Sequence, residues 1–177
     1  MAESLEFLDG EPGVCRIAGL RNIMIISWSD RANGAAVVKL DHGSKRMVAA
    51  YPGGFSAIHI IADKAGVPTP DARSGLMRIM NEQAKSIACV GVVVGGTGFW
   101  ASTMRSFITG MRFMTPRNFD LRLHGTTAEL IEWLPKQHAK VTGISVDAKT
   151  LERVLDSVDS WPSETADLWA RTSGTGT

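Results

Sequence analysis

Residues 87–98 read IACVGVVVGGTG and lead directly into Phe99–Met114. The run 87–94 is continuously apolar and rich in β-branched side chains, which is typical of a strand buried on both faces. The glycines that follow indicate a tight turn. Phe99–Met114 has helical periodicity and stops before Pro116, and a further short strand is predicted over Phe119–Leu123. The segment is therefore a strand–turn–helix–strand unit, which predicts a parallel α/β sheet.

Apolar runs and helix signals alternate along the rest of the chain. Two short strands come first and can pair as a hairpin around Gly19–Asn22, and a helix, a strand and a helix follow them. Beyond the opening unit, a short helix starts at the capping box Thr126/Glu129 and ends at Pro135, and Asp147 caps a last helix. The predicted strands are Val14–Ala18, Ile23–Trp28, Phe55–Ala62, 87–94 and Phe119–Leu123. The order β-β-α-β-α-β-α-β-α plus a C-terminal helix predicts an α/β fold. Its small mixed sheet has about five strands, with helices mainly on one face.

The same pattern divides the chain into four parts. Residues 1–12 are polar and are separated by Gly10 and Pro12, so we predict a disordered tail there. The α/β domain covers 13–135, and 136–160 form a connector and the C-terminal helix. Residues 161–177 turn to Ser, Thr, Gly and Pro and predict a second disordered tail.

Composition disfavours several functional classes. The net charge is +1, with 19 basic and 18 acidic residues, so binding to nucleic acid is not expected. Cys15 and Cys89 lie in apolar runs and are predicted to be buried, and no CxxC or Cys/His cluster suggests a metal site. No apolar stretch approaches the roughly 18 residues of a membrane span, and the N-terminus has no secretory pattern. We therefore expect a cytoplasmic protein that is not inserted into a membrane.

The glycine turn is the first candidate site. The stretch 96–101 fits G-x-G-x-x-A between a strand and a helix, the context in which backbone amides bind a pyrophosphate. Bulky Phe99 and Trp100 are expected to crowd that approach, and Asp120 falls at the wrong end of its strand for a ribose-binding acid. We predict a structural turn and no cofactor. A nucleotide-binding turn remains the alternative, formed by Gly95, Gly96, Thr97 and Gly98.

No catalytic constellation stands out. The chain has neither a G-x-S-x-G elbow nor a Walker A motif, and its carboxylates are scattered. His59 lies inside a predicted strand, where a half-buried or hydrogen-bonded histidine is expected and a ligand or base is the alternative. We predict no catalytic residue and no metal ligand, and hence a protein that is not an enzyme.

Candidate partner-binding residues lie elsewhere. Arg105 and Arg112 are seven residues apart, so both fall on one side of the helix predicted over Phe99–Met114, where they could bind an acidic partner. Trp161 and Trp169 are large aromatic residues in the C-terminal tail and are candidate docking residues.

The element order and several stretches resemble the STAS-like families, which include anti-sigma-factor antagonists and SEC14/STAS-like bacterial proteins. The resemblance covers residues 13–135 and implies a small mixed sheet with helices mostly to one side. It also implies a phosphorylation switch at Ser74, because 71–76 (DARSGL) is similar to the D-S-S-G-L run of the antagonists. The stretches that carry it are Ile58–Ala62, Pro70–Met80 with Arg73, Val92–Arg105 and Ala128–Leu134.

Three functions follow as hypotheses. The first is a non-enzymatic regulatory module that binds an unidentified protein or a second copy of itself. The alternative is a small-molecule or lipid-binding domain, as the SEC14-like relatives suggest, and the Met and Phe side chains of Phe99–Met114 favour it. The third is a nucleotide-binding enzyme that acts through Gly96–Gly98.

Overall fold

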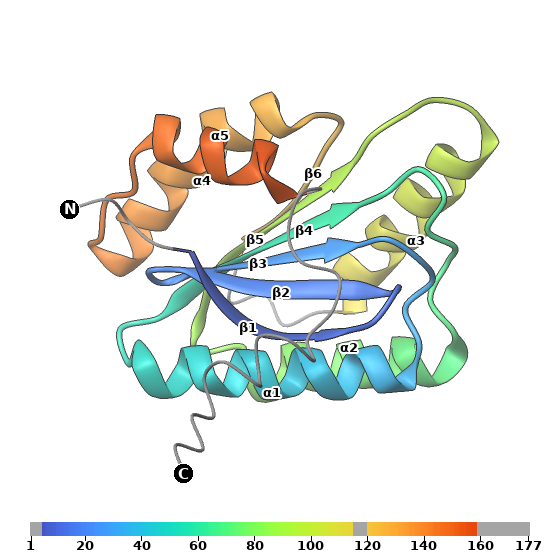
Figure 1. The fold of residues 1–177 in the computed structure, drawn as a ribbon, viewed down its shortest axis with the longest axis horizontal. Coiled ribbons are helices and arrows are strands. Elements are labelled where there is room, and N and C mark those ends of the chain that lie inside the picture. Colours follow the sequence, from blue (N-terminus) through green and yellow to red (C-terminus); the bar gives the residue numbers. More distant parts are fainter. Residues whose placement is uncertain (1–4, 115–119, 159–177) are drawn as a thin grey trace, which may run out of the picture.

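The protein is a three-layer α/β structure built on one mixed sheet (Figure 1). The computed structural model describes residues 5–114 and 120–158. The strands lie side by side in the order of the chain, antiparallel from β1 to β3 and parallel from β3 to β6. They are β1 Glu6–Glu11, β2 Cys15–Leu20, β3 Ile23–Trp28, β4 Phe55–Ile61, β5 Ile87–Val94 and β6 Asp120–His124. The predicted α/β class and mixed sheet are confirmed.

Helices cover both faces of this sheet. They are α1 Gly34–Ala50, α2 Pro70–Glu82, α3 Phe99–Met114, α4 Thr127–Thr142 and α5 Ala148–Asp156. The helices α1, α2 and α3 connect the parallel strands and lie on one face, so most of the described helices share a face, as predicted. The helices α4 and α5 follow the last strand and pack on the opposite face (Figure 1).

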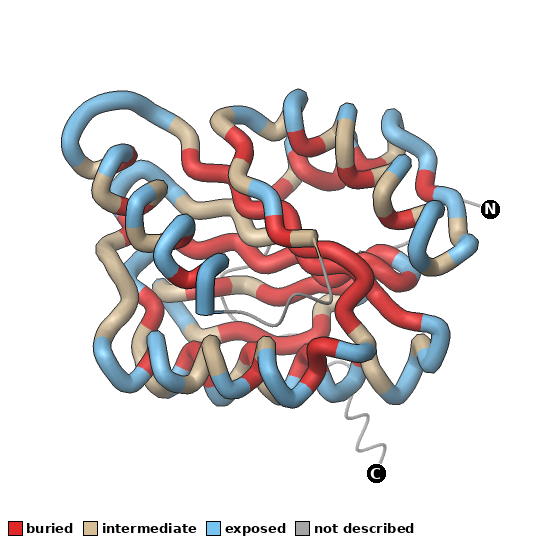
Figure 2. The backbone as a smooth tube through the Cα atoms, turned by 180° about the vertical axis from the view of Figure 1, so that it is seen from behind, coloured by how far each residue is buried: buried red, intermediate tan, exposed pale blue. Residues whose placement is uncertain are grey.

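The sheet is buried on both faces because each helical layer has its own apolar core. All eight residues of β5 are buried, as its β-branched run predicts. Side chains that alternate along the strands enter different cores: Ile26 faces α1–α3, and Ile25 faces α4 and α5. In Figure 2 the buried residues follow the strands and the inner sides of the helices, while the outer helical turns are exposed.

The first strand corrects the prediction of a disordered tail over residues 1–12. Residues 6–11 form β1, which pairs antiparallel with β2 and brings the sheet to six strands instead of about five. Its one deeply buried aliphatic side chain, Leu8, packs into the core beside α1. Polar contacts also join β1 to α1: Asp9 lies 2.6 Å from His42 Nδ1, and Arg46 donates to the Leu8 carbonyl at 2.7 Å. The polar composition of residues 6–11 gives no strand signal in the sequence. The strand is held in place by backbone pairing with β2 and by contacts with α1.

The helix α4 corrects the second domain boundary. Pro135 was predicted to end this helix, but the helix continues to Thr142 and ends at Gly143 in the left-handed conformation. Its buried residues Leu130, Leu134 and His138 are spaced by four, so tertiary contacts persist beyond the proline. The predicted connector shrinks to a few residues, and Asp147 caps α5 as expected. Residues 161–177, predicted as a tail, lie outside the described residues. Among the described helices, none is long and apolar enough to cross a membrane.

Candidate functional site

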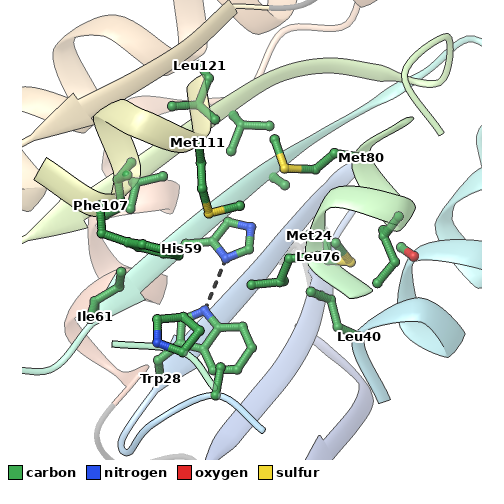
Figure 3. Close-up of a pocket in the computed structure, with 18 of the residues that line it drawn as sticks. Met24, Trp28, Leu40, His59, Ile61, Leu76, Met80, Phe107, Met111 and Leu121 are labelled. Atoms are coloured by element: carbon green, nitrogen blue, oxygen red, sulfur yellow. Dashed lines mark hydrogen bonds between the residues drawn. The ribbon is translucent and has the colours of Figure 1, made fainter. Parts of the chain in front are cut away.

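A cavity of about 110 Å³ lies between the sheet and the α1–α3 layer (Figure 3). The strands β3, β4 and β5 form its floor, with Met24, Ala57 and Val92 among the floor residues. Helices α2 and α3 contribute mainly Leu, Ile, Met and Phe side chains. The exposed Asp30 and the partly exposed Gly66 form part of its outer rim, beyond the carboxyl ends of β3 and β4. Ligands of open α/β sheets commonly bind at this end of the strands.

The helix α2, which lines the cavity, packs closely against α1. A Cβ atom on Gly75 would lie 2.6 Å from Val37 Cγ1, so the absence of a side chain lets α2 approach α1 closely. The space between α2 and α3 is bordered by the flexible side chains of Met80 and Met111, and Figure 3 shows both beside the cavity. The Arg73 guanidinium of α2 lies over the Phe107 ring of α3, 5.9 Å from its centroid, and joins the two helices across this gap. The α2–α3 gap is thus bordered by adaptable side chains.

His59 is the central polar group of the cavity. Trp28 Nε1 donates a hydrogen bond to His59 Nδ1 at 3.1 Å, shown as the dashed line in Figure 3. Burial lowers the pKa of His59 from 6.5 to about 4, so the ring is neutral at neutral pH. The part of its surface that stays accessible faces the cavity. This confirms the expectation of a half-buried, hydrogen-bonded histidine.

A second polar group, Gln83, lines the cavity on the α2 side. Its Nε2 donates to Ser44 Oγ at 2.8 Å, and that hydroxyl donates to the Asp41 carbonyl at 2.9 Å. These two hydrogen bonds fix the orientation of the Gln83 side-chain amide, so that its Oε1 points away from Ser44. Within the described residues, Gln83 Oε1 is buried and accepts no hydrogen bond. A buried carbonyl without a donor is costly, so Gln83 Oε1 lowers the free energy of unfolding.

The polar groups that line the cavity are few. The neutral His59 lies on an apolar floor, and its hydrogen-bond partner among the described residues is the Trp28 indole. Across the described ranges, no three His, Cys, Asp or Glu side chains gather as metal ligands. The arrangement can hold an apolar molecule and orient it by a hydrogen bond to His59.

The opposite face of the sheet holds a buried polar chain that resembles a Ser–His–Asn triad. Ser56 Oγ lies 2.7 Å from His138 Nδ1, and His138 Nε2 lies 3.0 Å from Asn22 Oδ1. Cys89 Sγ lies 3.1 Å from the same Ser56 hydroxyl. All four side chains are fully buried beneath α4, so no substrate can reach the hydroxyl. The chain of hydrogen bonds therefore connects α4 to the sheet and has a structural role.

The predicted arginines have different surroundings. Arg105 donates to the carbonyls of Val94 (3.1 Å) and Gly96 (3.2 Å), so it holds the turn after β5 and is half-buried. Arg112 is exposed in the last turn of α3. The two share a helix, as predicted, but the hydrogen bonds of Arg105 direct its guanidinium to the backbone. Trp161 and Trp169 lie outside the described residues.

The glycine turn has the predicted conformation but a different environment. Gly96 and Gly98 have φ values of 76° and 90°, which favour glycine. A Cβ on Gly96 would come within 3.2 Å of an Asp63 carboxylate oxygen, so a negative charge lies beside the turn and disfavours a phosphate there. The Phe99 side chain, which was expected to crowd this turn, is 89% exposed at the start of α3. Trp100 instead donates to the Ala65 carbonyl at 2.7 Å and holds the loop after β4.

Ser74, the predicted phosphosite, lies exposed in α2, and its hydroxyl donates to the Pro70 carbonyl at 3.1 Å. Sequence reasoning identified His59 but missed the cavity, Gln83 and the partnership of His59 with Trp28. Methionines at positions 24, 80, 104 and 111 come from three elements, β3, α2 and α3, and all line the cavity, and this excess of flexible apolar residues was the available signal.

Comparison of the chain with protein-family models, with curated proteins and with solved structures gives no match. Function is therefore argued from the cavity and its lining.

Proposed function

We propose that this chain is a small-molecule-binding domain whose cavity takes a compact, mainly apolar ligand. The observation that carries the proposal is the cavity of about 110 Å³ between the sheet and α1–α3, with His59 at its centre. An engineered cavity of about 150 Å³ lined by similar side chains binds benzene or xenon. A ligand with roughly as many atoms as a small ring matches this size, whereas drug-sized ligands occupy about 300 Å³ or more. The size therefore disfavours a two-chain lipid.

Stability considerations support a ligand. An empty apolar cavity costs about 24 cal/mol per Å³, so a cavity of about 110 Å³ lowers the free energy of unfolding by roughly 3 kcal/mol relative to a filled core. The unsatisfied carbonyl of Gln83 adds to this cost. A ligand that fills the space would recover part of the cost of the empty cavity.

Methionine methyl groups provide the test. We would label them with ¹³C and titrate the protein with benzene, toluene and methylcyclopentane. The signals of Met24, Met80, Met104 and Met111 should shift because these residues line the cavity, and those of Met47 and Met77, which do not, should stay. The melting temperature should rise, since a ligand at about 100 times its Kd adds roughly 2.7 kcal/mol.

Two matched variants control this experiment. Leu76→Trp places a larger side chain on the cavity wall and should abolish the shifts, while Val38→Trp changes an exposed position of α1 and should preserve them. The proposed function is wrong if no probe shifts the methyl signals of the cavity methionines in the unmodified protein. It is also wrong if Leu76→Trp leaves binding unchanged.

A STAS-like regulatory role through protein binding is the second candidate. It is supported by Phe99 and Phe113 of α3, which are 89% and 85% exposed. They stand 14 residues apart in the helix, or about 21 Å, so they form two contact points and not one patch. Sedimentation velocity of the protein and of its Phe99→Ser and Phe113→Ser variants tests self-association. A monomer at all concentrations would rule out a second copy as the partner.

A further inference from the structure

We infer that the ligand of this cavity is a neutral molecule carrying a hydrogen-bond acceptor, such as a ketone or ether oxygen, bound by the Nε2–H of His59. The inference rests on the proposed ligand-binding function and adds the chemical class of the ligand. It derives from the geometry of the Trp28–His59 pair and from the charges around the cavity.

The tautomer of His59 follows from its partner. An indole N–H can only donate, so His59 Nδ1, 3.1 Å from Trp28 Nε1, must be the acceptor. The single proton of the neutral ring is therefore on Nε2. The indole and imidazole planes are only 9° apart, which keeps the imidazole aligned with its partner. In Figure 3 the other ring nitrogen points away from Trp28 and into the cavity. No other described residue accepts a hydrogen bond from it, so the cavity presents one oriented donor.

The charge of the ligand follows from the lining. A protonated His59 would lose its bond with Trp28, because both ring nitrogens would then carry protons. The cavity-lining residues include no lysine or arginine within the described ranges, and the charged one, Asp30, is acidic. A carboxylate or phosphate group would lie in an apolar space without a counter-ion, at a large desolvation cost. A neutral acceptor can receive the Nε2 proton without this cost.

Isosteric probes test the inference. Methylcyclopentane and cyclopentanone have the same number of non-hydrogen atoms, and the ketone alone can accept a hydrogen bond. We would measure both Kd values for the protein and for His59→Phe, which keeps a ring but removes the donor. The ratio of the hydrocarbon Kd to the ketone Kd should fall about 2- to 10-fold in His59→Phe, the range expected for one hydrogen bond. Val38→Trp, which changes an exposed position of α1 away from the cavity, should leave the ratio unchanged.

A second measurement does not depend on the variant folding. The ¹H and ¹⁵N signals of His59 Nε2 in the unmodified protein should move with cyclopentanone and stay with methylcyclopentane. Cyclopentanecarboxylate should bind more weakly than the ketone.

The outcomes separate the two proposals. The inference is overturned, and the binding function stands, in either of two cases in which both neutral probes bind. In the first, the ratio of the hydrocarbon Kd to the ketone Kd is the same in His59→Phe as in the unmodified protein. In the second, the His59 Nε2 signals do not shift when cyclopentanone is added. Tighter binding of the carboxylate than of the ketone also overturns the inference. If neither neutral probe binds, both proposals fail.

Discussion

Ser56 Oγ and His138 Nδ1 lie 2.7 Å apart although they are 82 residues apart in sequence, and this contact joins the centre of the sheet to α4. The directions of the neighbouring bonds follow from their donors. Asn22 Nδ2 donates to the Gly54 carbonyl, so Asn22 Oδ1 must accept the proton of His138 Nε2. His138 Nδ1 then accepts from Ser56, whose oxygen is left to accept from the Cys89 thiol. Every member is paired only while His138 is neutral.

This pairing predicts loss of stability in acid. Burial, with a smaller contribution from the charge of Arg21, lowers the pKa of His138 from 6.5 to about 4. Between these values the unfolded chain binds a proton that the folded protein excludes, so stability falls as the pH falls through this window. The share of His138 is about 3 kcal/mol, from about 1.4 kcal/mol for each pH unit.

Urea unfolding at several pH values measures this loss, and ¹⁵N NMR of the imidazole gives the tautomer and the pKa directly. His59 contributes in the same direction, since its pKa is also about 4. The variant His138→Gln should therefore flatten only part of the pH dependence. A His138 ring that titrates near pH 6.5, or that carries its proton on Nδ1, would contradict the prediction.

Removal of the Ser56 hydroxyl should be costly. In Ser56→Ala both His138 Nδ1 and the Cys89 thiol lose their partner in a site with no solvent exposure. We expect the free energy of unfolding to fall by about 1–3 kcal/mol, measured by urea denaturation. Ser74→Ala at an exposed position is the control and should change it by less than about 0.5 kcal/mol. Equal changes in the free energy of unfolding for the two substitutions would show that the buried hydrogen bonds of Ser56 do not stabilise the protein.

Two glycines should respond in opposite directions to alanine. A Cβ on Gly91 of β5 would overlap Leu130 Cδ1 of α4, so Gly91→Ala should push α4 outward and cost about 1–3 kcal/mol. A Cβ on Gly110 of α3 would meet no atom within 4 Å, so Gly110→Ala should stabilise the helix by about 0.5–1 kcal/mol. Thermal unfolding of the two variants gives both signs. A stabilised Gly91→Ala would mean that α4 does not pack on β5 as described.

Both cysteines should be inert in the folded protein. Burial raises the pKa of Cys15 and of Cys89 to about 11, so neither thiol forms the reactive thiolate at mildly alkaline pH. Ellman's reagent should therefore label neither residue until guanidinium chloride unfolds the chain, when both should react. Fast labelling of the native protein would contradict their burial.

Local signals in the sequence were sufficient for the regular elements between residues 13 and 135. The continuous apolar run of β5, the capping box at Thr126 and the cap at Asp147 all depend on neighbours within a few residues. The order of strands and helices followed from them. Each of these features is local, which is why one sequence was enough.

Features that depend on distant residues were missed. The strand β1 contains little apolar surface, and its pairing with β2 and its contacts with α1 hold it in place. The helix α4 passes Pro135 because His138 is fixed to Asn22 and Ser56, far away in the chain. Gly75 lets α2 approach α1 closely, and no periodicity reveals the cavity that lies between the sheet and α1–α3.

The strictly sequential strand order has a consequence for how the chain folds during synthesis. Each strand pairs with the one made immediately before it, so a nascent chain can extend the sheet from its growing edge without waiting for later segments. The bond between His138 and Asn22 spans 116 residues and can form only after the whole sheet has been made. Docking of α4 and then of α5 therefore follows formation of the sheet, and until then the apolar face that these helices cover stays exposed.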